Sequence, residues 1–199
     1  MNAAAPVVIK VGGSLLEWVG LPDRLPTLLA EQERPVVLIV GGGRAADLVR
    51  DLDRRHDLGE ERAHALALRA LDLTAHVLAA LVPGLEVVPS VADLDRMKRS
   101  GQIPILAPRL FLDEDDRLGP APLPHSWAVT SDAIAARVAV RLAAAELLLL
   151  KSAALPPGAD RAEAARLGLV DPAFPTASRP LGRVSYRNLR DPSAMIQPL

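Results

Sequence analysis

The sequence contains no cysteine, and it has only five aromatic residues among its 199 positions. The lack of cysteine excludes disulfides, iron–sulfur clusters and thiolate zinc sites. A net charge of −1 and so few aromatic rings argue against nucleic-acid binding, which usually needs a basic surface and stacking platforms. The chain is instead 50% hydrophobic and 24% charged, a composition typical of a globular protein with one well-packed core.

Long apolar runs and a secretion signal are also missing. The most apolar stretch, Ala133 to Leu150, is interrupted by Arg137, Arg141 and Glu146, so it falls short of the roughly 20 apolar residues that a bilayer span needs. Residues 1–10 lack the basic start and long apolar core of a signal peptide. We therefore expect a cytoplasmic protein with no membrane partner.

Strand and helix patterns alternate along the chain. Two β-branched runs, at 6–11 and 35–40, predict buried strands, and further strands are predicted at 85–89, 103–107 and 146–151, with an edge strand near 184–186. Apolar spacing and capping residues predict helices at 21–33, 44–55, 60–81, 90–101, 130–145 and 160–167, and residues 108–125 are predicted to form a long loop. This order indicates an α/β protein, a three-layer α/β/α sandwich with a mainly parallel central sheet.

Glycines follow each of the first two predicted strands, as Gly12-Gly13 and as Gly41-Gly42-Gly43. The carboxyl ends of parallel strands meet at one edge of a sheet, where backbone N–H groups and helix N-termini bind anions, so we expect phosphate there. A tight structural turn is an equally good explanation for either loop alone. Neither loop is a Walker A sequence, because no Gly-Lys-Ser/Thr follows at the required spacing.

The residues Gly41 to Ala46 also satisfy the dinucleotide pattern G-x-G-x-x-A. That pattern requires an acidic residue about 20 positions further on, at the end of a second strand. Here Glu60 and Glu61 begin a predicted helix, and the pattern leaves Lys10 unexplained. A dinucleotide site is therefore disfavoured.

Lysine is rare, with three residues among 23 basic ones. Lys10 and Lys151 each end an apolar run, and we expect them to supply compact ammonium groups that arginine cannot replace. Lys98 lies in a polar stretch and is predicted to be a solvated helix residue.

Four segments carry a resemblance to a known family: PVVIKVGGSLL, VVLIVGGGRAADLVR, HSWAVTSDAIAARVA and, directly after it in the pattern, ELLLLKS. Together they resemble the amino acid kinase superfamily in the correct order from Val7 to Ser152. Residues 41–72 and the segment LPHSWAVTSDAIAARVA look like the short archaeal-type branch that phosphorylates aminomethylfuran-methanol phosphate in methanofuran biosynthesis. The resemblance implies an ATP-dependent kinase that uses Mg²⁺ and a small phosphate monoester. It also implies a homo-oligomer of one domain over 1–199, with an acceptor side in 1–130 and a reduced nucleotide side in 131–199.

The resemblance assigns roles to individual residues. Lys10 matches the family lysine that contacts the transferring phosphoryl group, Asp132 the aspartate that orients the lysines, and Lys151 the lysine that ends the following strand. The nucleotide is expected at Gly12, Gly13, Ser14 and Ser152. The acceptor is expected at Gly41, Gly42, Gly43, Arg44, Arg50, Ser126 and Thr130, with His125 nearby. Arg50 is equally well explained as a surface residue, and an isolated loop histidine such as His125 is more often structural. Asp132 could simply offset a helix dipole, but its position two residues after Thr130, at the mouth of the same crevice, favours a functional role.

No metal site is predicted within the chain. Asp113 to Asp116 could attract Mg²⁺, but a solvated turn is expected, because metals in phosphoryl transfer usually need carboxylates at the phosphate site. Lys151 is followed by Ser152-Ala153-Ala154 where many relatives have Asp-Gly, and Ala128 stands where close relatives have Asp. These departures keep open a non-catalytic protein that binds a nucleotide or an oxyanion.

Overall fold

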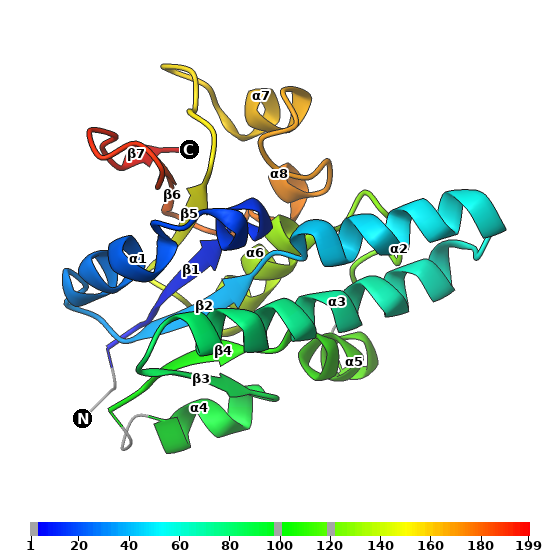
Figure 1. Ribbon diagram of the computed structural model, residues 1–199, viewed down its shortest axis with the longest axis horizontal. Helices are drawn as coiled ribbons and strands as arrows, with labels where there is room; N and C mark the ends of the chain where they lie inside the picture. Colours follow the sequence, from blue (N-terminus) through cyan, green and yellow to red (C-terminus); the bar gives the residue numbers. More distant parts are fainter. Residues whose placement is uncertain (1–3, 98–100, 119–121) are drawn as a thin grey trace.

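A seven-stranded sheet runs through the protein in the order β3-β4-β2-β1-β5-β6-β7 (Figure 1). The computed structural model describes residues 4–97, 101–118 and 122–199, so Lys98 lies outside the described residues. Six strands pair with one another in parallel: β1 (Val7–Val11), β2 (Val36–Val40), β3 (Leu85–Val88), β4 (Ile103–Leu106), β5 (Glu146–Lys151) and β6 (Val184–Asn188). The short β7 (Gln197–Pro198) is antiparallel to β6. The predicted mainly parallel sheet is confirmed.

Helices pack on both faces of this sheet. The remaining elements are η1 (Gly13–Glu17), α1 (Leu21–Ala30), α2 (Gly43–His56), α3 (Glu60–Leu81), α4 (Val91–Met97), α5 (Pro108–Leu118), α6 (Ser131–Arg141), α7 (Arg161–Arg166) and α8 (Phe174–Ala177). Successive side chains of a strand point to opposite faces of the sheet. Ile9 belongs to the apolar cluster formed with η1, α1 and part of α3, and Val8 belongs to the cluster on the other face, which includes residues of α4, α5, α6 and α8. The three-layer arrangement is confirmed.

Helices α2 and α3 lie side by side and extend beyond the sheet (Figure 1). None of the residues of α2 is buried, whereas α3 buries one side, including Leu71 and Leu78. Among the described residues, α3 is the one helix long and apolar enough, by length and composition, to cross a membrane. This is weak evidence for a membrane span, because a buried core helix passes the same test.

The predicted loop over 108–125 is wrong, because residues 108–118 form helix α5. Phe111 and Leu112 are buried on its inner side, and so is Asp115, at a position where an apolar residue would be expected. Arg137 and Arg141 of α6 contact the Asp115 carboxylate at 3.5 and 3.1 Å and compensate its charge. The expected solvated turn at residues 113–116 is therefore also wrong.

Smaller differences occur towards the C-terminus. Strand β6 is not an edge strand, because β7 pairs with its outer side, and neither β7 nor α8 was predicted. Helix α6 ends at Arg141 rather than near 145, and α1 ends at Ala30 rather than near 33. Helix α4 confirms the first part of the helix expected over 90–101, of which residues 98–100 lie outside the described residues.

Candidate functional site

Lys10 and Lys151 share one carboxylate, that of Asp132. Their Nζ atoms lie 2.8 Å from Asp132 Oδ1 and Oδ2, respectively. Lys10 pairs in register with Leu149 of β5, so Lys151, two residues further, points to the same face of the sheet as Lys10. That face carries α6, whose first turn holds Asp132. Strand alternation and the start of one helix thus bring the three predicted residues together.

Burial makes this cluster electrostatically strong. Asp132 and Lys10 are each only 4% exposed. Burial alone would raise the pKa of Asp132, but the ammonium groups of Lys10 and Lys151 lower it to about 2. Burial lowers the pKa of Lys151 to about 8, although Asp132 opposes this shift. At neutral pH Asp132 is therefore ionised beside a mainly protonated Lys151.

Asp171, which the sequence reasoning missed, completes this cluster. Its backbone N–H donates to Asp132 Oδ2 at 3.2 Å. Its own Oδ2 accepts hydrogen bonds from the backbone N–H groups of Thr130 and Ala133 and from the Thr130 hydroxyl, at 2.9 to 3.0 Å. Asp171 therefore caps the start of α6, a role expected for Thr130 or Ser131 themselves. Burial, followed by the charge of Asp132, raises the pKa of Asp171.

The two glycine loops contact each other through their backbones beside these lysines. A Cβ atom on Gly13 would collide with the backbone of Gly43 and lie 2.7 Å from the Gly41 carbonyl oxygen. Gly43 has a φ of +48°, which side chains rarely tolerate. A Cβ on Gly41 would lie 3.3 Å from Lys10 Nζ, so the second loop reaches the lysine. Gly12 lies against the end of β5, since its N–H donates to the Leu150 carbonyl oxygen at 2.8 Å.

The residues expected on the nucleotide side also meet. The hydroxyls of Ser14 and Ser152 are hydrogen-bonded at 2.8 Å, although 138 residues separate them. Arg190, which the sequence did not single out, donates from Nη2 to the Ser14 carbonyl oxygen at 2.9 Å. This part of the site therefore combines two hydroxyls with a guanidinium, groups that suit phosphate oxygens.

A cavity of about 150 Å³ adjoins the second glycine loop. Five residues predicted for the acceptor line it: Gly42, Gly43, Arg50, Ser126 and Thr130. Trp127 and Ser131, which were not predicted, line it as well. Arg44 does not line this cavity; its side chain is 83% exposed and pairs with Glu17 at 2.8 Å.

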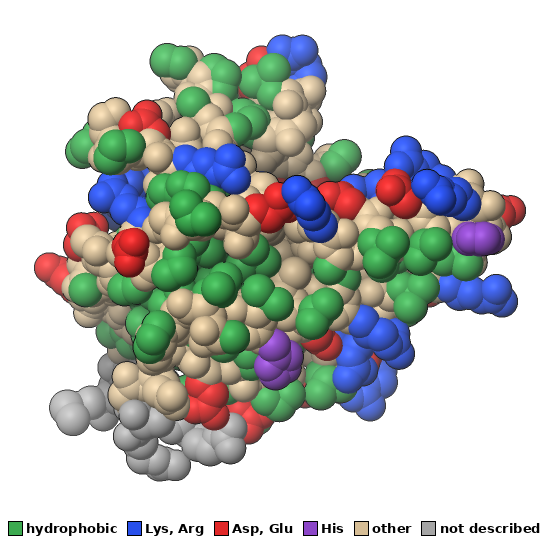
Figure 2. All heavy atoms as spheres, in the orientation of Figure 1, with side chains coloured by type: hydrophobic (Ala, Val, Ile, Leu, Met, Phe, Trp, Pro, Cys, Tyr) green, Lys and Arg blue, Asp and Glu red, His purple; other side chains and the backbone are tan. Residues whose placement is uncertain are grey.

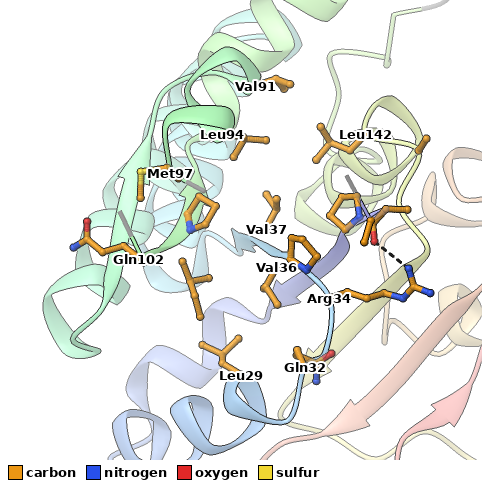
Figure 3. A pocket seen from close by; sticks show the side chains of 18 residues that line it. Leu29, Gln32, Arg34, Val36, Val37, Val91, Leu94, Met97, Gln102 and Leu142 are labelled. Atoms are coloured by element: carbon orange, nitrogen blue, oxygen red, sulfur yellow. Dashed lines mark hydrogen bonds between the residues drawn. The ribbon is translucent and has the colours of Figure 1, made fainter. Parts of the chain in front are cut away.

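A larger cavity, of about 770 Å³, opens where the amino ends of β2 and β4 diverge (Figure 3). Its walls are mainly apolar and include Val37, Leu94 and Leu142, while Arg34 donates to the Ala5 carbonyl oxygen at its rim. The lysines lie at the carboxyl ends of the strands, so this cavity is at the opposite edge of the sheet. None of the predicted site residues lines it.

The cluster suits a polyphosphate rather than a protein-held metal. Both oxygens of Asp132 already contact lysines. Among the described residues, no group of three or more His, Asp or Glu side chains could hold a metal ion. Mg²⁺ in phosphoryl-transfer sites usually keeps substrate phosphates as ligands. The donor set is therefore compatible with Mg²⁺ that arrives bound to a nucleotide.

The chain is similar to known proteins in sequence and in fold. The model of the amino acid kinase family matches residues 5–154. The chain is 29% identical over 143 residues to [5-(aminomethyl)furan-3-yl]methyl phosphate kinase from Methanocaldococcus jannaschii. That alignment covers 71% of this chain but only 63% of the relative's length.

Solved structures with a similar fold include uridylate kinase from Archaeoglobus fulgidus, with a TM-score of 0.61 and 15% identity over 90% of this chain and 89% of that one. UMP kinase from Ureaplasma parvum gives a TM-score of 0.64 and 14% identity over 96% of this chain and 92% of that one. At such identities these similarities show the fold alone. The family model, which matches most of the chain, shows that the protein belongs to the amino acid kinase family.

Proposed function

We propose that this protein is an ATP-dependent kinase that phosphorylates a small phosphate monoester. The observation that supports this proposal is the pair of buried lysines held by Asp132 at the point where two glycine loops meet. Fixed cations and backbone N–H donors are what phosphoryl transfer requires, because charge develops on the phosphoryl oxygens while the protein forms no covalent bond.

In this proposal each group has a separate task. Lys10, at the centre of the sheet, stabilises charge on the transferring phosphoryl group, and Lys151 neutralises phosphate oxygens from the neighbouring strand. Asp132 holds both ammonium groups in place. A phosphate oxygen of the acceptor bonds to the terminal phosphorus of ATP, the bond to ADP breaks, and the products are ADP and a diphosphate. Mg²⁺ bound to the nucleotide supplies further charge neutralisation.

The relative from M. jannaschii suggests the acceptor. Its name specifies [5-(aminomethyl)furan-3-yl]methyl phosphate, and we propose this compound as the acceptor here, which places the protein in methanofuran biosynthesis. The cavity beside Gly42 and Gly43 supplies a site for the organic part of such a molecule. Arg50 and Thr130 on its wall are suited to bind the phosphate.

The proposal is tested by measuring ADP release from Mg-ATP with a panel of phosphate monoesters that includes the furan compound, UMP and glycerol phosphate. We expect ADP release to depend on the furan compound and to exceed that with the other acceptors. Nucleotide binding by calorimetry without acceptor-dependent ADP release would instead support a non-catalytic binding protein. The sequence Ser152-Ala153-Ala154 after β5 favours that second candidate.

We further propose that residues 1–130 form the acceptor-side lobe of one domain and 131–199 its reduced nucleotide-side lobe, with Gly12, Gly13 and Ser14 of the first lobe also contacting the nucleotide. We propose a cytoplasmic homo-oligomer that binds neither membrane nor nucleic acid. Helix α3 exposes a row of apolar side chains, Leu66, Leu73, Val77 and Leu81, within a face rich in hydrophobic groups (Figure 2). Apolar surface of this kind marks sites of protein association. Sedimentation velocity of the wild type and of Leu73→Glu tests the oligomer, and we expect the variant to be smaller.

A further inference from the structure

Trp127 belongs to a segment that contacts the C-terminal half of α2 and the first turns of α3. Its indole N–H donates to Asp53 Oδ2 of α2 at 2.7 Å. The guanidinium carbon of Arg50 lies 4.6 Å from the centre of the Trp127 ring, a cation–π contact. The ring is therefore held to α2 at its edge and on its face.

His125, two residues earlier, attaches the same segment to two other helices. Its Nδ1 lies 2.7 Å from Glu61 Oε2 of α3, and its Nε2 lies 2.7 Å from Asp116 Oδ2 of α5. Its ring also stacks on His64 of α3, with 4.7 Å between ring centres. The segment from His125 to Trp127 is thus fixed to α2, α3 and α5 and acts as a rigid wall.

Ser126 and Trp127 of this wall line the cavity of about 150 Å³ beside the second glycine loop. The lining also includes the apolar side chains Leu68, Leu71 and Ile134. Ser131, which also lines the cavity, lies near Gly41 and hence near Lys10, because a Cβ on Gly41 would be 3.1 Å from Ser131 Oγ. The cavity therefore adjoins the lysine cluster directly.

The volume of the cavity limits what it can hold. A cavity of roughly 150 Å³ in a protein core accommodates one benzene molecule. A nucleoside contains a base and a ribose, so it is larger than a single ring. A furan, a benzene ring or a short alkyl chain fits.

We propose that Trp127 is the specificity-determining residue of the acceptor site, and that its fixed ring restricts the acceptor to phosphate monoesters with a single ring or a short chain. This inference rests on the proposed function, since it concerns the same acceptor. It adds the chemical class of acceptor that the site admits and the side chain that excludes nucleoside monophosphates. The uridylate and UMP kinases share the fold with this chain at 15% identity or less, so the exclusion of UMP does not conflict with that similarity.

A binding measurement tests the inference without turnover. The chain contains two tryptophans, so Trp18→Phe leaves Trp127 as the only strong fluorophore. We expect furfuryl phosphate, a single-ring probe, to change its emission in a saturable way, and UMP to have at least tenfold weaker binding. Equal binding of the two probes, or furfuryl phosphate binding that leaves the Trp127 emission unchanged, overturns the inference.

A kinetic measurement tests the side chain itself. In Trp127→Ala, the ratio of kcat/KM for furfuryl phosphate to that for UMP should fall by about tenfold or more, the scale of a lost apolar wall. Trp127→Phe should keep most of the selectivity, because it retains a ring, and it covers the case in which the alanine variant does not fold. Trp18→Ala, which alters another half-buried tryptophan outside this cavity, is the matched control and should leave the ratio unchanged.

The outcomes separate the two proposals. If the wild type turns over furfuryl phosphate and UMP equally well, the specificity inference is wrong while the kinase proposal stands. If no monoester is turned over but furfuryl phosphate alone binds at Trp127, the kinase proposal fails and the size selection stands. If neither probe binds nor reacts, the specificity inference is overturned, and the kinase proposal is overturned as well if the furan compound of the ADP-release panel also fails to react.

Discussion

The backbone N–H of Asp171 donates a hydrogen bond to the carboxylate of Asp132, the group that both lysines share. Asp171 lies between α7 and α8, 39 residues after its partner. The segment after β5 is thereby attached to the residue that positions Lys10 and Lys151. Through this contact the segment after β5 helps to hold Asp132 in place, although that segment contributes no lysine to the cluster.

The first prediction concerns the side chain of Asp171. Asp171→Ala removes the acceptor of three hydrogen bonds at the start of α6 and should lower the free energy of unfolding by about 1–3 kcal/mol in urea denaturation. Asp171→Asn keeps a carbonyl acceptor. It also removes a charge that burial and Asp132 already make unfavourable, so it should cost much less. Equal losses in the two variants would show that hydrogen bonding is not the main contribution.

Lys10→Met should lower turnover by about 100-fold or more, the effect expected for loss of one electrostatic group in the transition state. Its stability cost should stay below the roughly 3–5 kcal/mol of leaving a buried charge unpaired, because Asp132 retains Lys151. Ile9→Val, on the other face of β1, is the control and should cost about 0.5–1.5 kcal/mol in stability without a change in turnover. Similar turnover in both variants would make Lys10 structural.

The pKa of Lys151 predicts the pH at which activity falls on the alkaline side of the pH–rate profile. Because burial lowers this pKa to about 8, the ammonium loses its proton as the pH rises through 8, and kcat/KM should fall there. The folded-state pKa lies below the ordinary 10.5, so the ammonium is unfavourable in the folded state below pH 8, and stability should rise between pH 8 and 10.5.

Lys151→Arg provides the check on this assignment. Arginine keeps its charge throughout this range, so the limb near pH 8 should disappear, while the rate at pH 7 should be lower because a planar guanidinium does not reproduce a compact ammonium. A pH–rate profile that keeps the same limb in Lys151→Arg would assign it to another group.

Two arginines predicted for the acceptor, Arg44 and Arg50, should differ in their effect. Arg50 lines the acceptor cavity, so Arg50→Ala should raise the acceptor KM by about tenfold or more, since a charged hydrogen bond is worth roughly 1.5–3 kcal/mol. Arg44 pairs with Glu17 on the surface, and Arg44→Ala should change KM by no more than about twofold. Steady-state kinetics with varied acceptor distinguishes them, and an effect at Arg44 equal to that at Arg50 contradicts the placement.

The parts of the candidate site that lie at strand ends could be predicted from local sequence patterns. Lys10 is the last residue but one of β1, Lys151 ends β5, and glycine follows β1 and β2, so the edge of the sheet at which they meet could be predicted. Helix α5 was missed because Asp115 occupies an apolar position and is compensated by arginines of α6, a contact between distant segments. Asp171 was missed for the same reason, since its partners lie 38 to 41 residues away. A lone acidic residue in the apolar stretch from Leu169 to Phe174 was the available signal.

³¹P NMR of the wild type with Mg-ATP and [5-(aminomethyl)furan-3-yl]methyl phosphate follows both products of the proposed reaction at once. We expect resonances of a new diphosphate ester to grow in step with those of ADP, and both to be lost in Lys10→Met. ADP that forms at the same rate without the acceptor, or a diphosphate that forms undiminished in Lys10→Met, would contradict the assignment of the Lys10–Asp132–Lys151 cluster as the phosphoryl-transfer site.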